Sequence, residues 1–295
     1  MTTSIRHGLH ETYVSGTLRR SPVTDRPTET HDRSDFVPSP FDPAVTRHPE
    51  TAARTPWPTT LDAPAPGALD LWLLHVPDPW PAAAALDLAP LDAGERARAA
   101  AFVRDTDRVR YVAAHLMLRR VLGAYLHLPP GDVEFTREPC PCCGEDHGRP
   151  AVAAPGAPHF SLSHGGGLVL LGVAAGAVGV DVEEPPAEST VRDVSAALHP
   201  AEREEVAAAP PERRAAVFAR LWVRKEAYLK GLGTGLGREL DLDYLGNGGP
   251  GAPAWPEGWT VVDVPVGAGH AAAAVRGALS SRYDVRRLDP AGLAG

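Results

Sequence analysis

The most apolar stretch of the chain constrains its fold most. LVLLGVAAGAVGV, residues 168–180, contains 13 residues, three of them glycines, whereas a membrane-spanning helix needs about 20 apolar residues. The glycines divide the stretch into short runs that resemble buried strands in length and composition. GVDVEE, residues 179–184, then places three carboxylates within four positions. We therefore expect successive strands here, the last ending in concentrated negative charge.

Other patterns predict an α+β protein. Alternation over residues 68–76 predicts a strand, the periodicity over residues 91–126 predicts one helix, and residues 159–164 predict another strand. Two helices are expected over residues 191–209 and 212–233, followed by three strand-like segments. The order of elements suggests two similar α+β halves.

We expect three parts: an extension over residues 1–67, an N-terminal half over 68–178 and a C-terminal half over 179–288. The extension is rich in Pro, Thr, Arg and Asp, and its apolar residues follow no period, so we expect it to be disordered. It contains no apolar segment typical of a signal peptide. We accordingly expect a cytoplasmic, monomeric protein with no membrane partner. The net charge of −8 argues against nucleic acid as a partner.

The three cysteines lie together in CPCCG and are followed by His147. An odd number packed so tightly is not a disulfide framework. Cys140 and Cys143 have the C-x-x-C spacing of zinc ligands, and His147 could add a third. The candidates for a fourth ligand, Cys142 and Asp146, are awkwardly placed. A zinc-binding segment and a loop of reduced thiols therefore both remain open.

Asp181 and Glu183 are candidate metal ligands. Alternate residues of a strand point to the same side, so both carboxylates share one face while Val180 and Val182 face the core. Such carboxylates repel each other unless they are solvated or share a cation. A solvated strand end is the simpler hypothesis for this motif alone.

The helix containing LWVRKEAYLKG favours a site. Glu226 and Lys230 lie four positions apart on the face that also carries Trp222. A solvated Glu–Lys pair would contribute only a few tenths of a kcal/mol, but Trp222 indicates that this face is partly buried. A third carboxylate would complete an oxygen-rich Mg²⁺ site, which commonly takes further ligands from phosphate. Lys230 would then act on a phosphate group.

FSLSHGGG suggests a rival hypothesis, a hydrolase with a nucleophilic Ser163 and His164. It lacks the G-x-S-x-G turn, and no acid is placed by spacing to orient the histidine. The three glycines are not a phosphate loop, because no G-K-[ST] follows. His164 could also be a satisfied core histidine.

Taken in order, GRP, FSLSH, GVDVEE and WVRKEAYLK resemble the 4′-phosphopantetheinyl transferase superfamily, specifically its longer Sfp-type enzymes. The motifs G-x-D-x-E and W-x-x-K-E-A-x-x-K are matched at every fixed position. The resemblance covers about residues 68–288 and implies a pseudo-dimer of two α+β halves with coenzyme A in the cleft between them. Gly165 is a departure, because many relatives carry Ser or Thr there.

The resemblance implies that Asp181, Glu183 and Glu226 bind Mg²⁺ on the pyrophosphate of coenzyme A. The implied reaction moves the phosphopantetheine arm to a serine of an apo acyl- or peptidyl-carrier protein and releases 3′,5′-ADP. Glu226 would act as the base, and Lys230 would neutralise or protonate the departing phosphate. The implied coenzyme A contacts are Arg98, Arg110, Arg149, Ser163, His164 and Lys225.

The sequence leaves some alternatives open. Arg98 and Arg110 rest on a looser alignment of the first helix and could belong to a solvated helix face. A coenzyme A or nucleotide-binding module without turnover would also use the carboxylates, although simple binding needs neither Glu226 nor Lys230. Fatty-acid, polyketide and nonribosomal-peptide carriers are equally compatible with the motifs.

Overall fold

The computed structural model describes residues 54–294 except positions 268, 281 and 282. Its α-helices are α1 (Ala93–Ala100), α2 (Asp105–Leu126), α3 (Glu188–Ser195), α4 (Pro200–Ala208) and α5 (Pro211–Leu232). Its strands are β1 (Leu69–His75), β2 (Phe135–Arg137), β3 (Pro150–Val152), β4 (His159–Gly165), β5 (Leu168–Ala174), β6 (Val178–Glu183), β7 (Trp259–Asp263), β8 (His270–Arg276) and β9 (Asp284–Leu288). Short 3₁₀ turns are η4 (Pro81–Ala85), η5 (Pro130–Asp132), η6 (Gly235–Gly237) and η7 (Pro290–Leu293). This mixture confirms the predicted α+β class.

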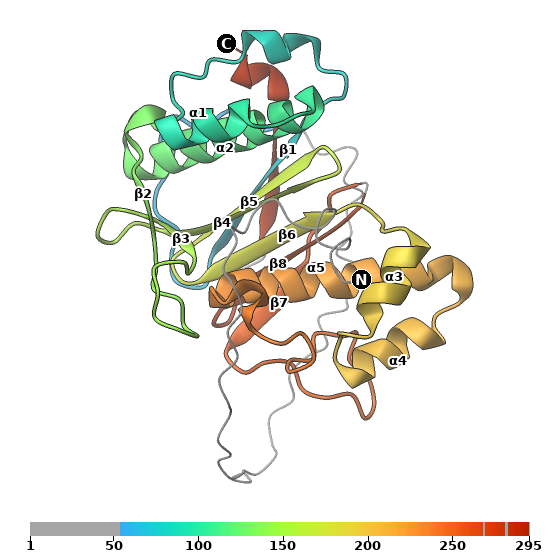
Figure 1. The fold of residues 1–295 in the computed structure, drawn as a ribbon. Coiled ribbons are helices and arrows are strands. Elements are labelled where there is room, and N and C mark those ends of the chain that lie inside the picture. The colour runs from blue at the N-terminus through green and yellow to red at the C-terminus, as the bar shows by residue number, and fades with distance from the viewer. Residues whose placement is uncertain (1–53, 268, 281–282, 295) are drawn as a thin grey trace. The chain divides into compact units, whose positions relative to one another are not determined.

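The strands form two larger sheets and one hairpin. One sheet has the order β4-β5-β1-β9 and another the order β6-β8-β7, while β2 pairs with β3. All pairs are antiparallel except β1 with β9, which is parallel. Figure 1 shows α1 and α2 on one side of the strands and α5 on the other.

Strand alternation builds the layers between these helices. On β1, Trp72 and Leu74 pack with α2, whereas Leu71 and Leu73 pack against the sheet that contains β6. On β8, Ala272 and Ala274 face α5, and their neighbours face the other sheet. Because β1 and β8 each bury both faces, the core extends from α2 through two sheets to α5.

The predicted extension needs a correction at its end. Residues 1–53 lie outside the described residues, but the segment that follows is attached to the folded body. The Thr55 amide donates to the Arg287 carbonyl oxygen at 2.7 Å, and Trp57 Nε1 donates to the Asp289 carbonyl oxygen at 2.8 Å. Trp57 and Leu61 also pack against the core beside α2. An extended segment can bury single apolar residues without any period, so periodicity did not reveal it.

Two predicted helices are each divided. The helix expected over residues 91–126 is α1 followed by α2, and the helix expected over residues 191–209 is α3 followed by α4. Pro200 opens α4, with His199 and Glu202 forming a reciprocal cap. Proline suits the first turn of a helix because its missing N–H leaves no bond unmade there.

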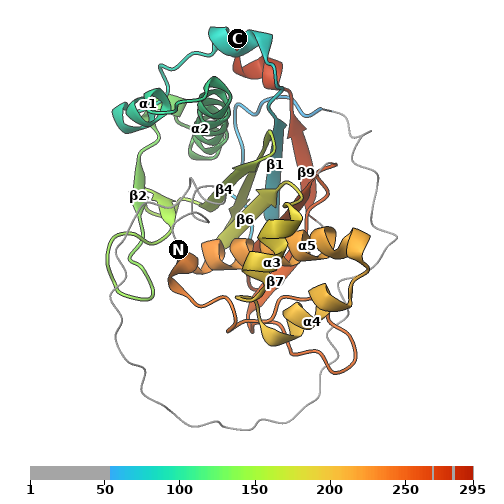
Figure 2. The ribbon, with the colours of Figure 1, turned by 45° about the vertical axis from the view of Figure 1, so that its right-hand side comes forward.

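The C-terminal strand departs from the predicted division of the chain at residue 178. β9 lies beside β1, as Figure 2 shows, and completes the sheet of the N-terminal half. The remaining C-terminal strands, β6, β7 and β8, form their own sheet with α5 packed on it. Among the described residues, none of the helices combines the length and apolar character needed to cross a membrane.

Candidate functional site

The site is built where α5 packs on β6, at a contact closer than side chains would allow. A Cβ atom on Gly179 of β6 would lie 1.9 Å from the carbonyl oxygen of Ala227 and 2.3 Å from the amide nitrogen of Gly231. The absence of a side chain at Gly179 therefore lets the helix backbone rest on the strand. This contact joins the two sequence motifs, since Gly179 opens the first and Ala227 belongs to the second.

Asp181 is the buried centre of the site and is 1% exposed. Its Oδ1 accepts from Lys230 Nζ at 2.7 Å and from the Ser163 hydroxyl at 2.9 Å, and Lys230 also donates to Ser163 at 3.1 Å. Val180 and Val182 face the core on the other side of the strand, which confirms the predicted alternation. The hypothesis of a solvated strand end is wrong for Asp181.

The second oxygen of Asp181 is available to a ligand. Oδ2 is buried and has no hydrogen-bond partner among the described residues. A buried carboxylate oxygen left unpaired costs free energy. Such an atom suits a cation as its partner.

Three carboxylates act on the single ammonium group of Lys230. Burial works to lower the pKa of Lys230, but attraction to Asp181, Glu226 and Glu183 outweighs it and raises the pKa. Burial raises the pKa of Asp181, and the nearby Glu226 charge raises it further against the pull of Lys230. With the three carboxylates and the ammonium ionised, the cluster carries two net negative charges, which one divalent cation would neutralise.

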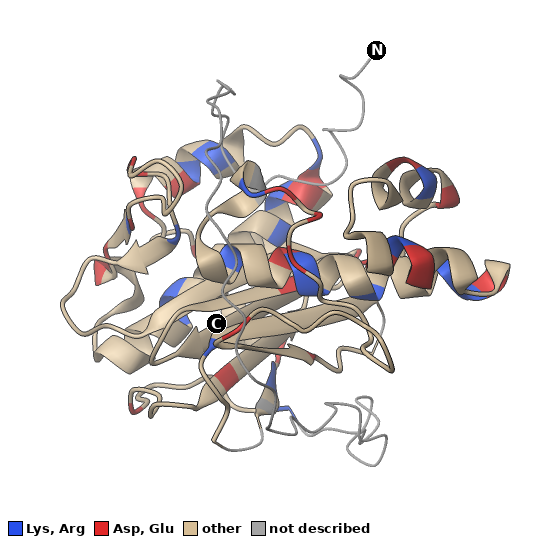
Figure 3. Cartoon of the chain, turned by 90° about the horizontal axis from the view of Figure 1, so that it is seen from below, with Lys and Arg blue, Asp and Glu red and all other residues tan. Residues whose placement is uncertain are grey.

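The alternative of a solvated Glu226–Lys230 pair is wrong. Glu226 is 3% exposed, and the Lys230 side chain is 9% exposed. Lys230 binds Asp181 of β6 across the helix–strand contact. Figure 3 shows Lys and Arg interspersed with Asp and Glu along the helices, so formal charge alone does not mark the site.

His164 lies on the opposite side of β4 from Ser163 and faces α2. Burial, followed by the electrostatic influence of His115, Lys230 and Arg110, lowers the pKa of His164 to about 4, against the attraction of Asp107. The imidazole is therefore neutral at pH 7 and stands among cationic side chains. Arg110 Nε is buried without a hydrogen-bond partner among the described residues, although its Nη2 donates to Asp78 at 3.4 Å.

Arg149 connects the β2–β3 hairpin with the end of α5. Its Nη1 donates to the carbonyl oxygen of Gly231 at 2.6 Å, and its Nε donates to Glu138 at 3.0 Å. Because Gly231 directly follows Lys230, the guanidinium is anchored beside the end of the carboxylate cluster.

Two predicted coenzyme A contacts lie elsewhere. Lys225 Nζ is 2.9 Å from Glu202 and donates to the Asp243 carbonyl oxygen at 2.6 Å. It turns toward α4 because consecutive helical residues differ by about 100° in direction. Arg98 is exposed on α1, with its guanidinium carbon 5.8 Å from the Phe102 ring centroid, and no described contact connects it with the carboxylates.

The serine-histidine stretch does not form a hydrolase pair. Ser161 and Ser163 face β6, where their hydroxyls accept from the amides of Val180 and Val182 at 3.1 and 3.4 Å. Ser163 directs its proton at Asp181, and none of the hydrogen bonds between described residues joins it to His164. These serines instead join the edge strands of the two sheets.

Gly165 gains a structural explanation. A Cβ atom at this position would lie 2.5 Å from the carbonyl oxygen of Val182. Glycine at this position therefore accompanies a close approach of β4 to β6.

His115 is a neighbour of the site that sequence reasoning missed. It acts on His164 electrostatically, and it lines a cavity of about 600 Å³ between the first two helices and the β2–β3 hairpin. Arg137 and Phe135 line the same cavity. The only sequence signal is the spacing of His115 four residues after Tyr111, whose ring centroid lies 4.1 Å from that of the histidine.

The comparisons with known proteins agree with this geometry. The family model for the "4′-phosphopantetheinyl transferase superfamily" matches residues 177–246, which include all the carboxylates of the cluster and Lys230. The chain is 31% identical over 180 residues to the 4′-phosphopantetheinyl transferase HetI of Nostoc sp., covering 59% of this chain and 73% of that protein.

Two further relatives match a shorter part of their own length. A phosphopantetheinyl transferase of Thraustochytrium sp. is 32% identical over 192 residues, covering 58% of this chain and 63% of that protein. The 4′-phosphopantetheinyl transferase Sfp of Bacillus subtilis is 23% identical over 147 residues, covering 50% of this chain and 62% of that protein. The match thus spans slightly less than two thirds of both proteins.

Proposed function

The chain belongs to the 4′-phosphopantetheinyl transferase superfamily, and on that premise we propose that it transfers the phosphopantetheine arm of coenzyme A to a carrier protein. The acceptor is a serine hydroxyl of an acyl- or peptidyl-carrier protein, and the second product is 3′,5′-ADP. One observation carries this proposal: Asp181 binds the buried ammonium of Lys230 at 2.7 Å, Glu226 and Glu183 act on it electrostatically, and the second oxygen of Asp181 has no described partner.

The donor set fits Mg²⁺. Asp181, Glu183 and Glu226 would hold it, since all three offer the hard oxygen atoms that this ion prefers. The unpaired Oδ2 of Asp181 and the net negative charge of the cluster support this assignment. When bound, the ion would offset the charge of the coenzyme A pyrophosphate.

Lys230 holds a proton where the leaving phosphate needs one. Asp181 and Ser163 fix its Nζ, and the raised pKa keeps it protonated at neutral pH. We propose that Nζ neutralises or protonates the departing phosphate oxygen. Glu226, on the same helix, would accept the proton of the carrier serine, directly or through a water.

The nucleotide end of coenzyme A would lie toward Arg110 and Arg149. Arg110 and Arg149 offer guanidinium groups, which bind phosphate in paired hydrogen bonds. The neutral His164 can donate one hydrogen bond without first taking up a proton. The cavity that His115 lines also contains Arg137 and Pro150, the residue after Arg149, together with the carboxylates Asp92, Glu95 and Asp146. Lys225 is left out because Glu202 binds it, and Arg98 could reach only a distant part of the ligand.

A binding module without turnover remains the second candidate. It would need the cation ligands but not a fixed proton donor. The two hydrogen bonds that orient Lys230 therefore favour catalysis.

The test is incubation of the full chain with coenzyme A, Mg²⁺ and a panel of apo-carrier proteins, followed by intact-mass measurement. One carrier should gain the mass of a phosphopantetheine arm. In single-turnover reactions, Asp181→Asn and Glu226→Gln should slow transfer by at least ~10²-fold.

Glu184→Gln is the matched control, because this exposed carboxylate follows Glu183 directly and has no place in the proposed site. Transfer by this variant should equal that of the unchanged protein. Normal transfer by Glu226→Gln would contradict the proposed mechanism, whereas coenzyme A binding without any mass gain would favour the binding module.

A further inference from the structure

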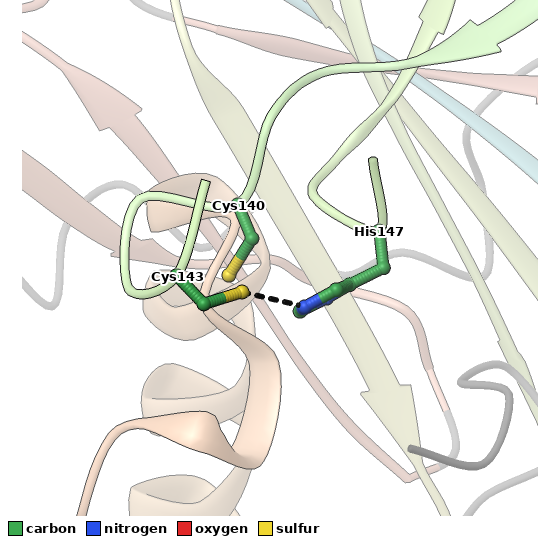
Figure 4. A group of neighbouring side chains, drawn as sticks. All are labelled: Cys140, Cys143 and His147. Carbon is green, nitrogen blue, oxygen red and sulfur yellow. Dashed lines mark hydrogen bonds between the residues drawn. The ribbon is translucent and has the colours of Figure 1, made fainter. Parts of the chain in front are cut away.

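The loop between β2 and β3 brings three metal-ligating side chains to one point. The ligand atoms of Cys140, Cys143 and His147 all lie within 4.8 Å of one another. Cys143 Sγ and His147 Nε2 are 2.9 Å apart. Figure 4 shows both sulfur atoms and the edge of the imidazole directed at a common space. Tetrahedral zinc with ordinary Zn–S and Zn–N bonds separates its ligand atoms by about 3.5–3.8 Å, so only small movements are needed.

Backbone hydrogen bonds close the loop around this point. The amide of Gly144 donates to the Cys140 carbonyl oxygen at 2.8 Å, and the amides of Cys140 and His147 donate to the Glu145 carbonyl oxygen at 2.7 and 2.8 Å. Gly144 has a φ angle of 78°, which favours glycine over residues with a Cβ. The C-x-x-C turn is therefore formed by the chain itself, before any ion binds.

The chemistry of Cys140 independently fits a metal ligand. The backbone amides of Cys142 and Cys143 donate hydrogen bonds to the Cys140 sulfur. Amide bonds to sulfur favour the thiolate, which is the form that binds metal ions. All three thiols are free.

We propose that Cys140, Cys143 and His147 bind one zinc ion, at a site separate from the carboxylate cluster. Two thiolates and an imidazole favour zinc over Mg²⁺ or Ca²⁺, which prefer oxygen ligands. Two thiolate charges would balance the charge of the ion. Cys143 and His147 are exposed, so water can occupy the fourth position, as it does in zinc sites with three protein ligands.

The ion would secure the end of the hairpin that carries Arg149. The amide of Glu138 donates to the Arg149 carbonyl oxygen at 2.9 Å, and the amide of Gly148 returns a bond to the Glu138 carbonyl oxygen at 2.9 Å. The proposed ligands all lie in the loop between these paired residues. The backbone hydrogen bonds of Glu138 join the two ends of the loop, and zinc would link its far end.

The test measures metal content and needs no carrier protein. The full chain, produced in zinc-supplemented medium and dialysed against zinc-free buffer without chelator, should retain about one zinc per chain by mass spectrometry of the metal. Cys143→Ser and His147→Ala should each reduce the retained zinc by at least about tenfold. Both side chains are exposed, so these variants should fold, and circular dichroism would verify it.

Cys142→Ser is the matched control, because its thiol is exposed and lies outside the three-residue cluster. It should retain most of the zinc. Co²⁺-loaded protein should show thiolate-to-metal absorption that is lost in Cys143→Ser and kept in Cys142→Ser. Equal zinc loss in all three variants, or a zinc-free chain whose thiols form a disulfide, would overturn the proposal. Neither result would bear on the transferase mechanism.

Discussion

Replacing Gly179 with alanine tests the contact on which the whole site rests. The added methyl group would stand 1.9 Å from the Ala227 carbonyl oxygen and 2.3 Å from the Gly231 amide nitrogen. Both obstacles are helix backbone, which cannot rotate away as a side chain can. We therefore expect α5 to withdraw from β6 by about 1 Å to restore an ordinary contact distance.

The expected cost follows from that displacement. Overpacking a filled core costs about 1–3 kcal/mol, and an immovable backbone places Gly179→Ala near the upper limit. For a unit of this size, about 3 kcal/mol lowers the melting temperature by roughly 6–12 °C. The Lys230–Asp181 hydrogen bond of 2.7 Å would lengthen beyond bonding distance. Transfer should fall by about 10²-fold, because catalytic geometry tolerates little displacement.

The assay compares Gly179→Ala with Gly176→Ala by thermal unfolding and single-turnover transfer. A Cβ atom at Gly176 would meet nothing within 4 Å, so this control should be neutral or stabilised by up to about 1 kcal/mol. If both variants melt together with the unchanged protein, the helix does not lie on the strand as described, and the account of the site is wrong.

Three other features can be tested by unfolding and titration. Deletion through residue 61 should destabilise the chain by about 2 kcal/mol relative to deletion through residue 53, because it removes the partly buried Trp57; equal urea midpoints would contradict this. Burial alone would raise the pKa of Asp263, but hydrogen bonds from Arg224 and Arg220 on α5 hold this pKa below its usual value of 3.8. That stability is present above about pH 4 and is lost as the pH falls through the folded pKa, so Asp263→Asn should differ from the unchanged protein at pH 7 and converge with it in acid. If the difference in unfolding free energy between the two proteins, measured by urea titration, were the same at every pH, this assignment would be wrong. NMR titration should give His164 a pKa of about 4, and a midpoint near 6.5 would show that the ring is not enclosed.

The composition of the carboxylate cluster was predictable because its signals are local. A period of two placed Asp181 and Glu183 on one face of a strand, and a period of 3.6 placed Glu226 and Lys230 on one face of a helix. The partner of Lys230 was not predictable. Glu226, four residues before Lys230 on the same helix, is an alternative partner for the ammonium group. Which carboxylate Lys230 binds depends on how closely α5 approaches β6. That distance is set by Gly179, whose role appears only when both elements are packed.

The missed helix boundaries have different causes. His199, Pro200 and Glu202 form the cap of α4, so the start of that helix has a local signal in the sequence. The break between α1 and α2 contains neither glycine nor proline, and α2 begins without a side-chain cap, so its local signal is limited to the acidic first turn with Asp105 and Asp107. There, Phe102 turns to contact Tyr111 on α2, with ring centroids 5.3 Å apart. This packing between the two helices accompanies the end of α1 and depends on how they are placed in space.

The pairing of β9 with β1 imposes an order on folding during synthesis. Leu71 lies opposite Val285, so β1 leaves the ribosome long before its neighbour has been made. Until then β4, β5 and β1 can pair, but the leucine-rich β1 presents a bare edge that can join strands of other chains. The Thr55 segment must also wait, because it binds Arg287. Chains that stop short of β9 should therefore aggregate rather than persist as partly folded, soluble fragments.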